Sequence, residues 1–102
     1  MKIKCLVLVA SLALANSAFA AADGAAVFKA KCVMCHGADG SASTGIGKSM
    51  GLKPLSSPEV QKMSDADLTA LVTNGKGKMP AYKGKLSDDE IGAVVKYVKT
   101  LR

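Results

Sequence analysis

Cys32-Val33-Met34-Cys35-His36 is the stretch of sequence that decides the fold of this chain. Residues three apart lie on one face of a helical turn, so both thiols can reach the same flat ligand. An imidazole follows directly after the second thiol. This pattern is typical of covalent haem attachment, in which each cysteine bonds one vinyl group and the histidine faces the iron.

Three other interpretations of the two cysteines compete with haem attachment. A Cys-x-x-Cys redox dithiol normally lies in a βαβ setting, and the sequence has no strand pattern. A zinc site needs four ligands, and His36 is the sole histidine, so such a site would be one ligand short. A structural disulfide suits an oxidising compartment but leaves the thin core unexplained. The sequence therefore favours haem.

Residues 1–20 predict a cleaved secretory signal peptide. Lys2 and Lys4 give a positive start, an uncharged apolar run of 5–15 follows, and Ala18-Phe19-Ala20 has the small-x-small pattern of a cleavage site. An uncleaved anchor is the alternative, but the apolar run is too short for a hydrocarbon core of about 30 Å. Cleavage after Ala20, or less favourably after Ala22, leaves a single exported domain over 21–102, expected in the periplasm without stable membrane insertion.

The mature chain has a thin core and a positive charge. Loss of Lys2 and Lys4 from 14 basic residues leaves 12, against 8 acidic ones, and loss of Cys5 leaves only the two cysteines of the motif. Its aromatic residues are Phe28, Tyr82 and Tyr97. Because domains of this size usually need a disulfide, metal or cofactor, a bulky apolar ligand is expected to complete the core.

The remaining pattern predicts an all-α domain of three to four short helices around one covalently bound haem. The first helix is expected from Asp23 to about Cys35, and 37–57 is expected to be a glycine-rich loop. Ser57-Pro58-Glu59 predicts the start of a short helix. Two longer helices are expected after capping sequences. One begins after Ser64-Asp65-Ala66-Asp67 and ends at Asn74-Gly75. The other begins after Ser87-Asp88-Asp89-Glu90 and has apolar residues at helical spacing to Leu101. Candidate hydrophobic staples pair Met63 with Leu68 and Leu86 with Ile91.

The second iron ligand is predicted to be Met79. Met34 lies inside the attachment motif, Met63 is better explained as a staple, and Met50 in the glycine-rich loop stays open as an alternative. Glycines around Met79 let the backbone approach a porphyrin closely, and Pro80 restricts the methionine to extended geometry.

With these motifs in place, the sequence resembles the class I monohaem cytochromes c in their short bacterial and algal-type form. The resemblance covers nearly the whole mature chain, and it is carried by Gly24-x-x-x-Phe28, Cys32 to His36, Asn74-Gly75 to Pro80-Ala81-Tyr82, Leu86 to Glu90, and Tyr97-Val98. It implies that Gly24 and Phe28 pack against Val94 and Tyr97, that His36 and Met79 are the proximal and distal ligands, and that Tyr82 lies near the haem edge. Family members often use a proline carbonyl to accept a hydrogen bond from the haem histidine; the only proline in the loop here, Pro54, lies further along the chain than expected.

A haem with both axial positions filled by His36 and Met79 suits electron transfer. The sequence therefore predicts a soluble, monomeric electron carrier and no enzyme activity. A haem sensor or peroxidase-like protein with a displaceable distal ligand is the alternative. Clustered lysines near the expected haem edge predict redox partners with an acidic surface, and they are Lys29, Lys31, Lys76, Lys78, Lys83 and Lys85. Nucleic-acid binding is not expected, because the charge is modest and export removes that partner.

Overall fold

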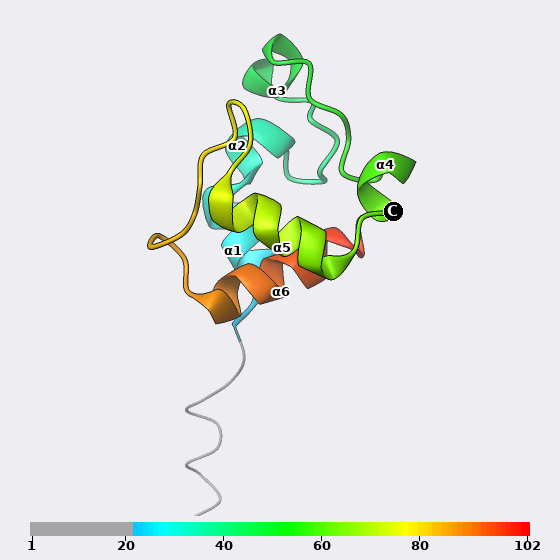
Figure 1. Ribbon diagram of the computed structural model, residues 1–102. Coiled ribbons are helices and arrows are strands. Elements are labelled where there is room, and N and C mark those ends of the chain that lie inside the picture. The colour runs from blue at the N-terminus through cyan, green and yellow to red at the C-terminus, as the bar shows by residue number, and fades with distance from the viewer. Residues whose placement is uncertain (1–21) are drawn as a thin grey trace, which may run out of the picture.

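The computed structural model describes residues 22–102, so the predicted signal peptide 1–20 lies outside the described residues. No strand is present in residues 22–102, which confirms the all-α fold class (Figure 1). The six helical segments are α1 (Gly24–Lys31), α2 (Val33–His36), α3 (Gly45–Ser49), α4 (Pro58–Gln61), α5 (Asp65–Asn74) and α6 (Asp88–Val98). Helices α2 and α3 account for the larger number than predicted, since α2 is separated from the first helix and α3 lies in the expected loop.

Helices α1 and α6 pack together and form the base of the domain, as the resemblance implied. Gly24 lies against the backbone of Ala93 and the Cβ of Tyr97. The rings of Phe28 and Tyr97 have centroids 5.3 Å apart at an interplanar angle of 51°. Phe28 and Val94 are each only 2% exposed and belong to one apolar cluster. A glycine at the crossing therefore allows the close approach that buries the phenylalanine.

Helix α5 also packs against α6. Both helices begin where the capping sequences predicted. The Ser87 hydroxyl accepts from the Glu90 N–H at 3.1 Å, and the Glu90 carboxylate accepts from the Ser87 N–H at 2.8 Å, which completes the capping box. At α5 the Ser64 hydroxyl accepts from the Asp67 N–H at 3.0 Å. Among the residues that the structure describes, the Asp67 carboxylate does not accept from the Ser64 N–H, because the aspartate side chain is one carbon shorter than glutamate.

Both predicted staples lie in the apolar cluster between α5 and α6. Leu68, Leu86 and Ile91 are buried there, and Met63 packs against them. Helix α4 is tied to the end of α6 by Lys99, whose ammonium donates to the Gln61 carbonyl at 2.9 Å and to the Met63 carbonyl. In Figure 1, α4 accordingly lies beside the C-terminus.

Two local features differ from the sequence-based expectation. The first helix ends at Lys31, and the chain restarts as α2 after Cys32, which has φ −114° and ψ −22°. Across this break the Cys32 N–H still donates to the Phe28 carbonyl at 2.8 Å, so the chain keeps a nearly helical path. The loop 37–57 contains the one-turn helix α3, capped by the Thr44 hydroxyl, which accepts from the Gly47 N–H at 2.8 Å. A single turn is too short to produce a hydrophobic period.

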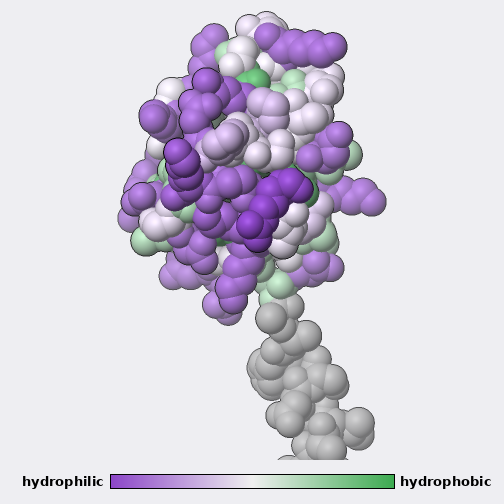
Figure 2. All heavy atoms as spheres, turned by 90° about the vertical axis from the view of Figure 1, so that its right-hand side faces the viewer, coloured by the Kyte–Doolittle hydropathy of each residue, from purple (hydrophilic) through white to green (hydrophobic). Residues whose placement is uncertain are grey.

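The outer surface and the interior differ in polarity. Figure 2 shows a face covered mostly by hydrophilic residues, with scattered apolar ones between them. Within the described part of the chain, no helix is both long enough and apolar enough to cross a membrane.

Candidate haem-binding site

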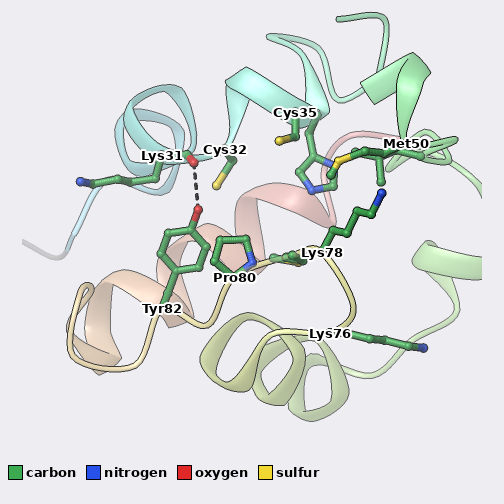
Figure 3. Close-up of a pocket in the computed structure, with 11 residues that line it drawn as sticks. Lys31, Cys32, Cys35, Met50, Lys76, Lys78, Pro80 and Tyr82 are labelled. Carbon is green, nitrogen blue, oxygen red and sulfur yellow. Dashed lines mark hydrogen bonds between the residues drawn. The ribbon is translucent and has the colours of Figure 1, made fainter. Parts of the chain in front are cut away.

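The site is a cleft between the turn that carries the two cysteines and the segment 75–86, which joins α5 to α6 (Figure 3). The cleft consists of two adjoining hollows of about 260 and 380 Å³. Both hollows are lined by Cys32, His36, Leu52, Lys76, Met79 and Tyr82. The larger hollow is lined further by apolar side chains of α1, α5 and α6, which include Phe28, Leu71, Val72, Val94 and Val98.

This lining explains why several predicted core residues are not fully buried. Leu71 and Val72 of α5 and Val98 of α6 are each half-buried, although their spacing predicts core positions. All three line the larger hollow, and Val72 and Val98 also pack against the buried core clusters. Apolar surface of this kind is stabilised by an apolar ligand, as the thin core predicted.

The attachment motif presents two thiols to the cleft. Cys32 and Cys35 are half-buried, line the smaller hollow and are not joined in a disulfide. Burial, and the thiol of Cys35 nearby, raise the pKa of the Cys32 thiol. In Figure 3 the sulfurs of Cys32, Cys35 and Met50 lie on one side of the cleft, across from Pro80 and Lys78. Two unpaired thiols beside an apolar hollow fit a ligand that is attached at two points.

His36 is held by the tight chain path that follows it. Its carbonyl accepts from the Ala42 N–H at 2.7 Å, and the preceding Cys35 carbonyl accepts from the Thr44 hydroxyl at 3.0 Å. Gly47 fits where a Cβ would meet the carbonyl oxygens of Cys35 and Ala42 at 2.5 and 2.6 Å. This packing fixes the backbone that carries the imidazole.

The imidazole of His36 is in a state that suits metal binding. Burial lowers the pKa of His36, which favours the neutral form that binds metals. Its Nδ1 atom is buried and has no hydrogen-bond partner among residues 22–102. The Pro54 carbonyl accepts from the Ser57 N–H at 3.0 Å, and Pro54 lines neither hollow. Pro54 therefore does not take the place of the family's proline beside the histidine in this structure.

The methionines separate into two groups. Met79 lines both hollows, and Met50 lines the smaller one, so the structure brings both candidates to the cleft that holds His36. Met34 is 73% exposed and does not line the cleft. Met63 packs in the α5–α6 cluster and reaches only the larger hollow. The choice between Met50 and Met79 that the sequence left open is thus a choice between two side chains of one cleft.

The segment around Met79 is a compact loop. The Met79 N–H donates to the Lys76 carbonyl at 2.9 Å, and the Lys76 N–H donates to the Met79 carbonyl at 3.1 Å. Gly75 has φ +76°, and a Cβ there would meet the Met79 carbonyl oxygen at 2.7 Å and the Ala81 nitrogen at 2.8 Å. Gly75 is therefore required for the loop to fold on itself, and the close approach of this backbone to a porphyrin stays a prediction.

Two features of the cleft were not found from the sequence. Leu52 lines both hollows from the glycine-rich loop, where no pattern marks it. The Tyr82 hydroxyl donates to the Lys31 carbonyl at 3.1 Å, across 51 residues of sequence. Neither contact leaves a local signal, because each depends on how distant segments meet.

The alternatives to haem are weakened by the donor set. Among the described residues 22–102, no group of three or more His, Cys, Asp or Glu side chains is placed to hold a metal ion. The same residues contain isolated bridges at 76–79 and 83–86 but no βαβ unit for a redox dithiol. Two thiols, one neutral imidazole and an apolar hollow fit a covalently bound porphyrin.

Comparison with known proteins agrees with this donor set. Residues 19–98 match the family model described as cytochrome c oxidase, cbb3-type, subunit III. The chain is 44% identical over 81 residues to cytochrome c6 of Leptolyngbya boryana, covering 76% of this chain and 88% of that protein. It is 37% identical over 97 residues to cytochrome c6 of Synechocystis sp., covering 92% and 78%.

Solved structures give the same result. The KustC0563 c-type cytochrome superposes with a TM-score of 0.72 at 30% identity, covering 78% of this chain and 98% of that one. Cytochrome c6C from Synechococcus sp. PCC 7002 superposes with a TM-score of 0.60 at 39% identity, covering 76% and 90%. The homologues are electron carriers and not enzymes, and the family implies covalently bound haem c. The predicted resemblance is confirmed: this chain belongs to the cytochrome c family and is homologous to cytochrome c6.

Proposed function

We propose that this protein carries single electrons on one haem c that is bonded to Cys32 and Cys35 and whose iron is bound by His36 and Met79. The observation that carries the proposal is that these four side chains, from two distant segments, line one cleft. The haem supplies the one-electron chemistry, and the protein supplies ligands and a largely apolar environment.

The chain's own residues define the site for that cofactor. The half-buried thiols provide two attachment points, which make loss of the cofactor impossible without breaking a covalent bond. His36 is neutral because of its burial, and its backbone is fixed by the bonds to Ala42 and Thr44. Met79 is restricted by Pro80, which keeps the thioether in one region of space. Two protein ligands leave no open position for a substrate, which favours electron transfer.

The ligand assignment is tested by two matched variants. Ferric absorption of the native protein should contain the methionine–iron charge-transfer band. Met79→Ala should abolish the band, and Met50→Ala should retain it. The opposite pattern would make Met50 the ligand, which is the other methionine of the smaller hollow.

The same spectra test the second candidate function. In a haem sensor or peroxidase-like protein the distal position is open or easily vacated. A native protein without the band, or one whose ferrous form binds carbon monoxide readily, would support that function over electron transfer. The presence of two methionines in the smaller hollow favours a filled position.

Exposed lysines at the mouth of the cleft support a partner with an acidic surface. Lys31, Lys76 and Lys78 line the smaller hollow and are exposed to solvent. Positive charge there steers an acidic partner toward the cofactor and speeds encounter, an effect that salt screens. We expect Lys76→Gln/Lys78→Gln to slow reduction by an acidic redox partner at low salt. Lys96→Gln, at an exposed position outside the cleft, is the control and should leave the rate unchanged.

The proposed location is the periplasm, with the mature domain over 21–102 as a monomer. The support is the positively charged start, short apolar run and Ala18-Phe19-Ala20 pattern of residues 1–20. Cell fractionation followed by intact-mass measurement should recover a haem-bearing chain that begins at Ala21. A full-length chain that retains Cys5 in the membrane fraction would contradict this proposal.

A further inference from the structure

One hydrogen bond joins the two walls of the cleft directly. The Tyr82 hydroxyl donates to the carbonyl of Lys31, the last residue of α1 and the neighbour of Cys32, at 3.1 Å (Figure 3). No other hydrogen bond in residues 22–102 connects the segment 75–86 with the attachment segment 29–36. The bond thus spans the cleft between the backbone next to Cys32 and the loop of residues 75–81 that contains Met79, the methionine loop.

Tyr82 directly follows the methionine loop, so its hydroxyl bond can hold that loop in place. Its N–H donates to the Val72 carbonyl at 3.0 Å, and its carbonyl accepts from the Leu86 N–H at 3.0 Å, so its backbone is fixed to α5 and to the start of α6. Its ring packs against the α5–α6 apolar cluster and lines both hollows. Met79 lies three residues before it, beyond Pro80 and Ala81.

The rest of the methionine loop has little else to hold it. Lys76, Gly77 and Lys78 are exposed, and the loop's own hydrogen bonds join Lys76 to Met79 within it. Bonds within a loop fix its shape but not its distance from the opposite wall. Only the tyrosine hydroxyl bonds to that wall.

We propose that Tyr82 is a positioning residue that clamps the methionine loop against the attachment turn and slows departure of the loop from the bound haem. The inference deepens the proposed function, since it rests on Met79 as the distal ligand. A single neutral hydrogen bond shifts an equilibrium by roughly 2- to 10-fold. Loss of the hydroxyl should therefore increase the open population of the loop by about that factor while the ring keeps its packing.

The test compares Tyr82→Phe with Tyr97→Phe in the haem-bearing protein. Tyr97 is the matched control, because it is also a half-buried tyrosine and its hydroxyl makes no hydrogen bond among the described residues. Imidazole binding to the ferric protein, which requires Met79 to leave, should be roughly 2- to 10-fold tighter in Tyr82→Phe. Tyr97→Phe should match the native protein. Equal affinity in all three proteins would overturn the clamp, provided that the native protein shows the methionine–iron band.

Amide hydrogen exchange tests the clamp without reference to the iron ligand. The N–H groups of Lys76 and Met79 should exchange faster in Tyr82→Phe, whereas those of Val94 and Val95 in α6 should be unchanged. If Tyr82→Phe accelerated all of these amides equally, the hydroxyl would contribute only global stability, and the proposal would be wrong. If the native protein lacked the methionine–iron band but the loop amides still responded selectively, the ligand assignment would fail and the clamp would stand.

Discussion

Gly24 at the start of α1 lies directly against the backbone carbonyl of Ala93 in α6, so the two helices touch where a side chain would otherwise separate them. The contact allows Phe28, one turn later, to be buried against Val94. These helices also carry part of the lining of the larger hollow. The helix crossing is therefore coupled to the shape of the haem site.

This contact predicts opposite effects for the same substitution at two helical glycines. Glycine to alanine in a helix normally stabilises by about 0.5–1 kcal/mol. Gly92→Ala in α6 should do so, because nothing lies within 4 Å of the new Cβ. Gly24→Ala should instead destabilise by about 1–3 kcal/mol, since its Cβ overlaps backbone that cannot move without parting the helices. Guanidinium unfolding of both variants measures the two changes in unfolding free energy. If both variants were stabilised, the backbone at the α1–α6 crossing would move to accommodate the new Cβ.

The two capping sequences give a second matched prediction. Glu90 and Asp67 occupy the same third position of α6 and α5, and both are acidic side chains near a helix N-terminus. Only Glu90 bonds back to the cap backbone, at 2.8 Å. Glu90→Ala should therefore cost about 0.5–1.5 kcal/mol more in unfolding free energy than Asp67→Ala. Equal losses would mean that the helix dipole, which both positions share, accounts for the whole effect.

The helix starts were predictable because their signals are local. The Ser64 and Ser87 hydroxyls each accept from a backbone N–H three residues later, and Pro58 occupies the first position of α4, so these signals lie within the local sequence. The break at Cys32 and the turn α3 were not predictable in the same way. Cys32 makes no side-chain capping bond that would mark the break, and α3, although Thr44 caps it locally, is too short to produce a hydrophobic period.

The residues of the site likewise differ in whether a local sequence pattern predicts them. Cys32, Cys35 and His36 form a motif within five residues, so they could be predicted without any knowledge of the fold. The sequence favoured Met79 over Met50 from the glycines and proline around it, and both side chains line one cleft in the structure. The Tyr82–Lys31 bond and the place of Leu52 depend on segments far apart in the chain, which no local pattern reports.

The turn after His36 gives a pH-dependent prediction. Hydrogen bonding from the Ser41 side chain and from its backbone N–H, which lies 3.0 Å from the carboxylate, lowers the pKa of Asp39. A carboxyl whose folded pKa lies below its unfolded value of about 3.9 stabilises the fold above that pH. The contribution is lost as the pH falls through the folded value. Asp39→Asn should therefore lose less stability than the native protein between pH 5 and pH 2; parallel stability curves would contradict this.

Thr44 gives the prediction closest to His36, the proposed haem ligand. Its half-buried hydroxyl donates to the Cys35 carbonyl at 3.0 Å and accepts from the Gly47 N–H at 2.8 Å, so one side chain joins α2 to α3. Thr44→Val keeps the shape but leaves both backbone groups without this partner, which should cost about 1–3 kcal/mol in unfolding free energy.

Thr44→Ser is the control for that prediction, because it keeps the hydroxyl and removes only a methyl group. Guanidinium unfolding of the haem-bearing protein should rank the native protein and Thr44→Ser close together, with Thr44→Val well below both. Since the Cys35 carbonyl directly precedes His36, Thr44→Val should also increase hydrogen exchange at the Ala42 N–H, which donates to the His36 carbonyl. A Thr44→Val protein as stable as Thr44→Ser would show that water replaces the hydroxyl and that the methyl group, not the bond, holds α3 against α2.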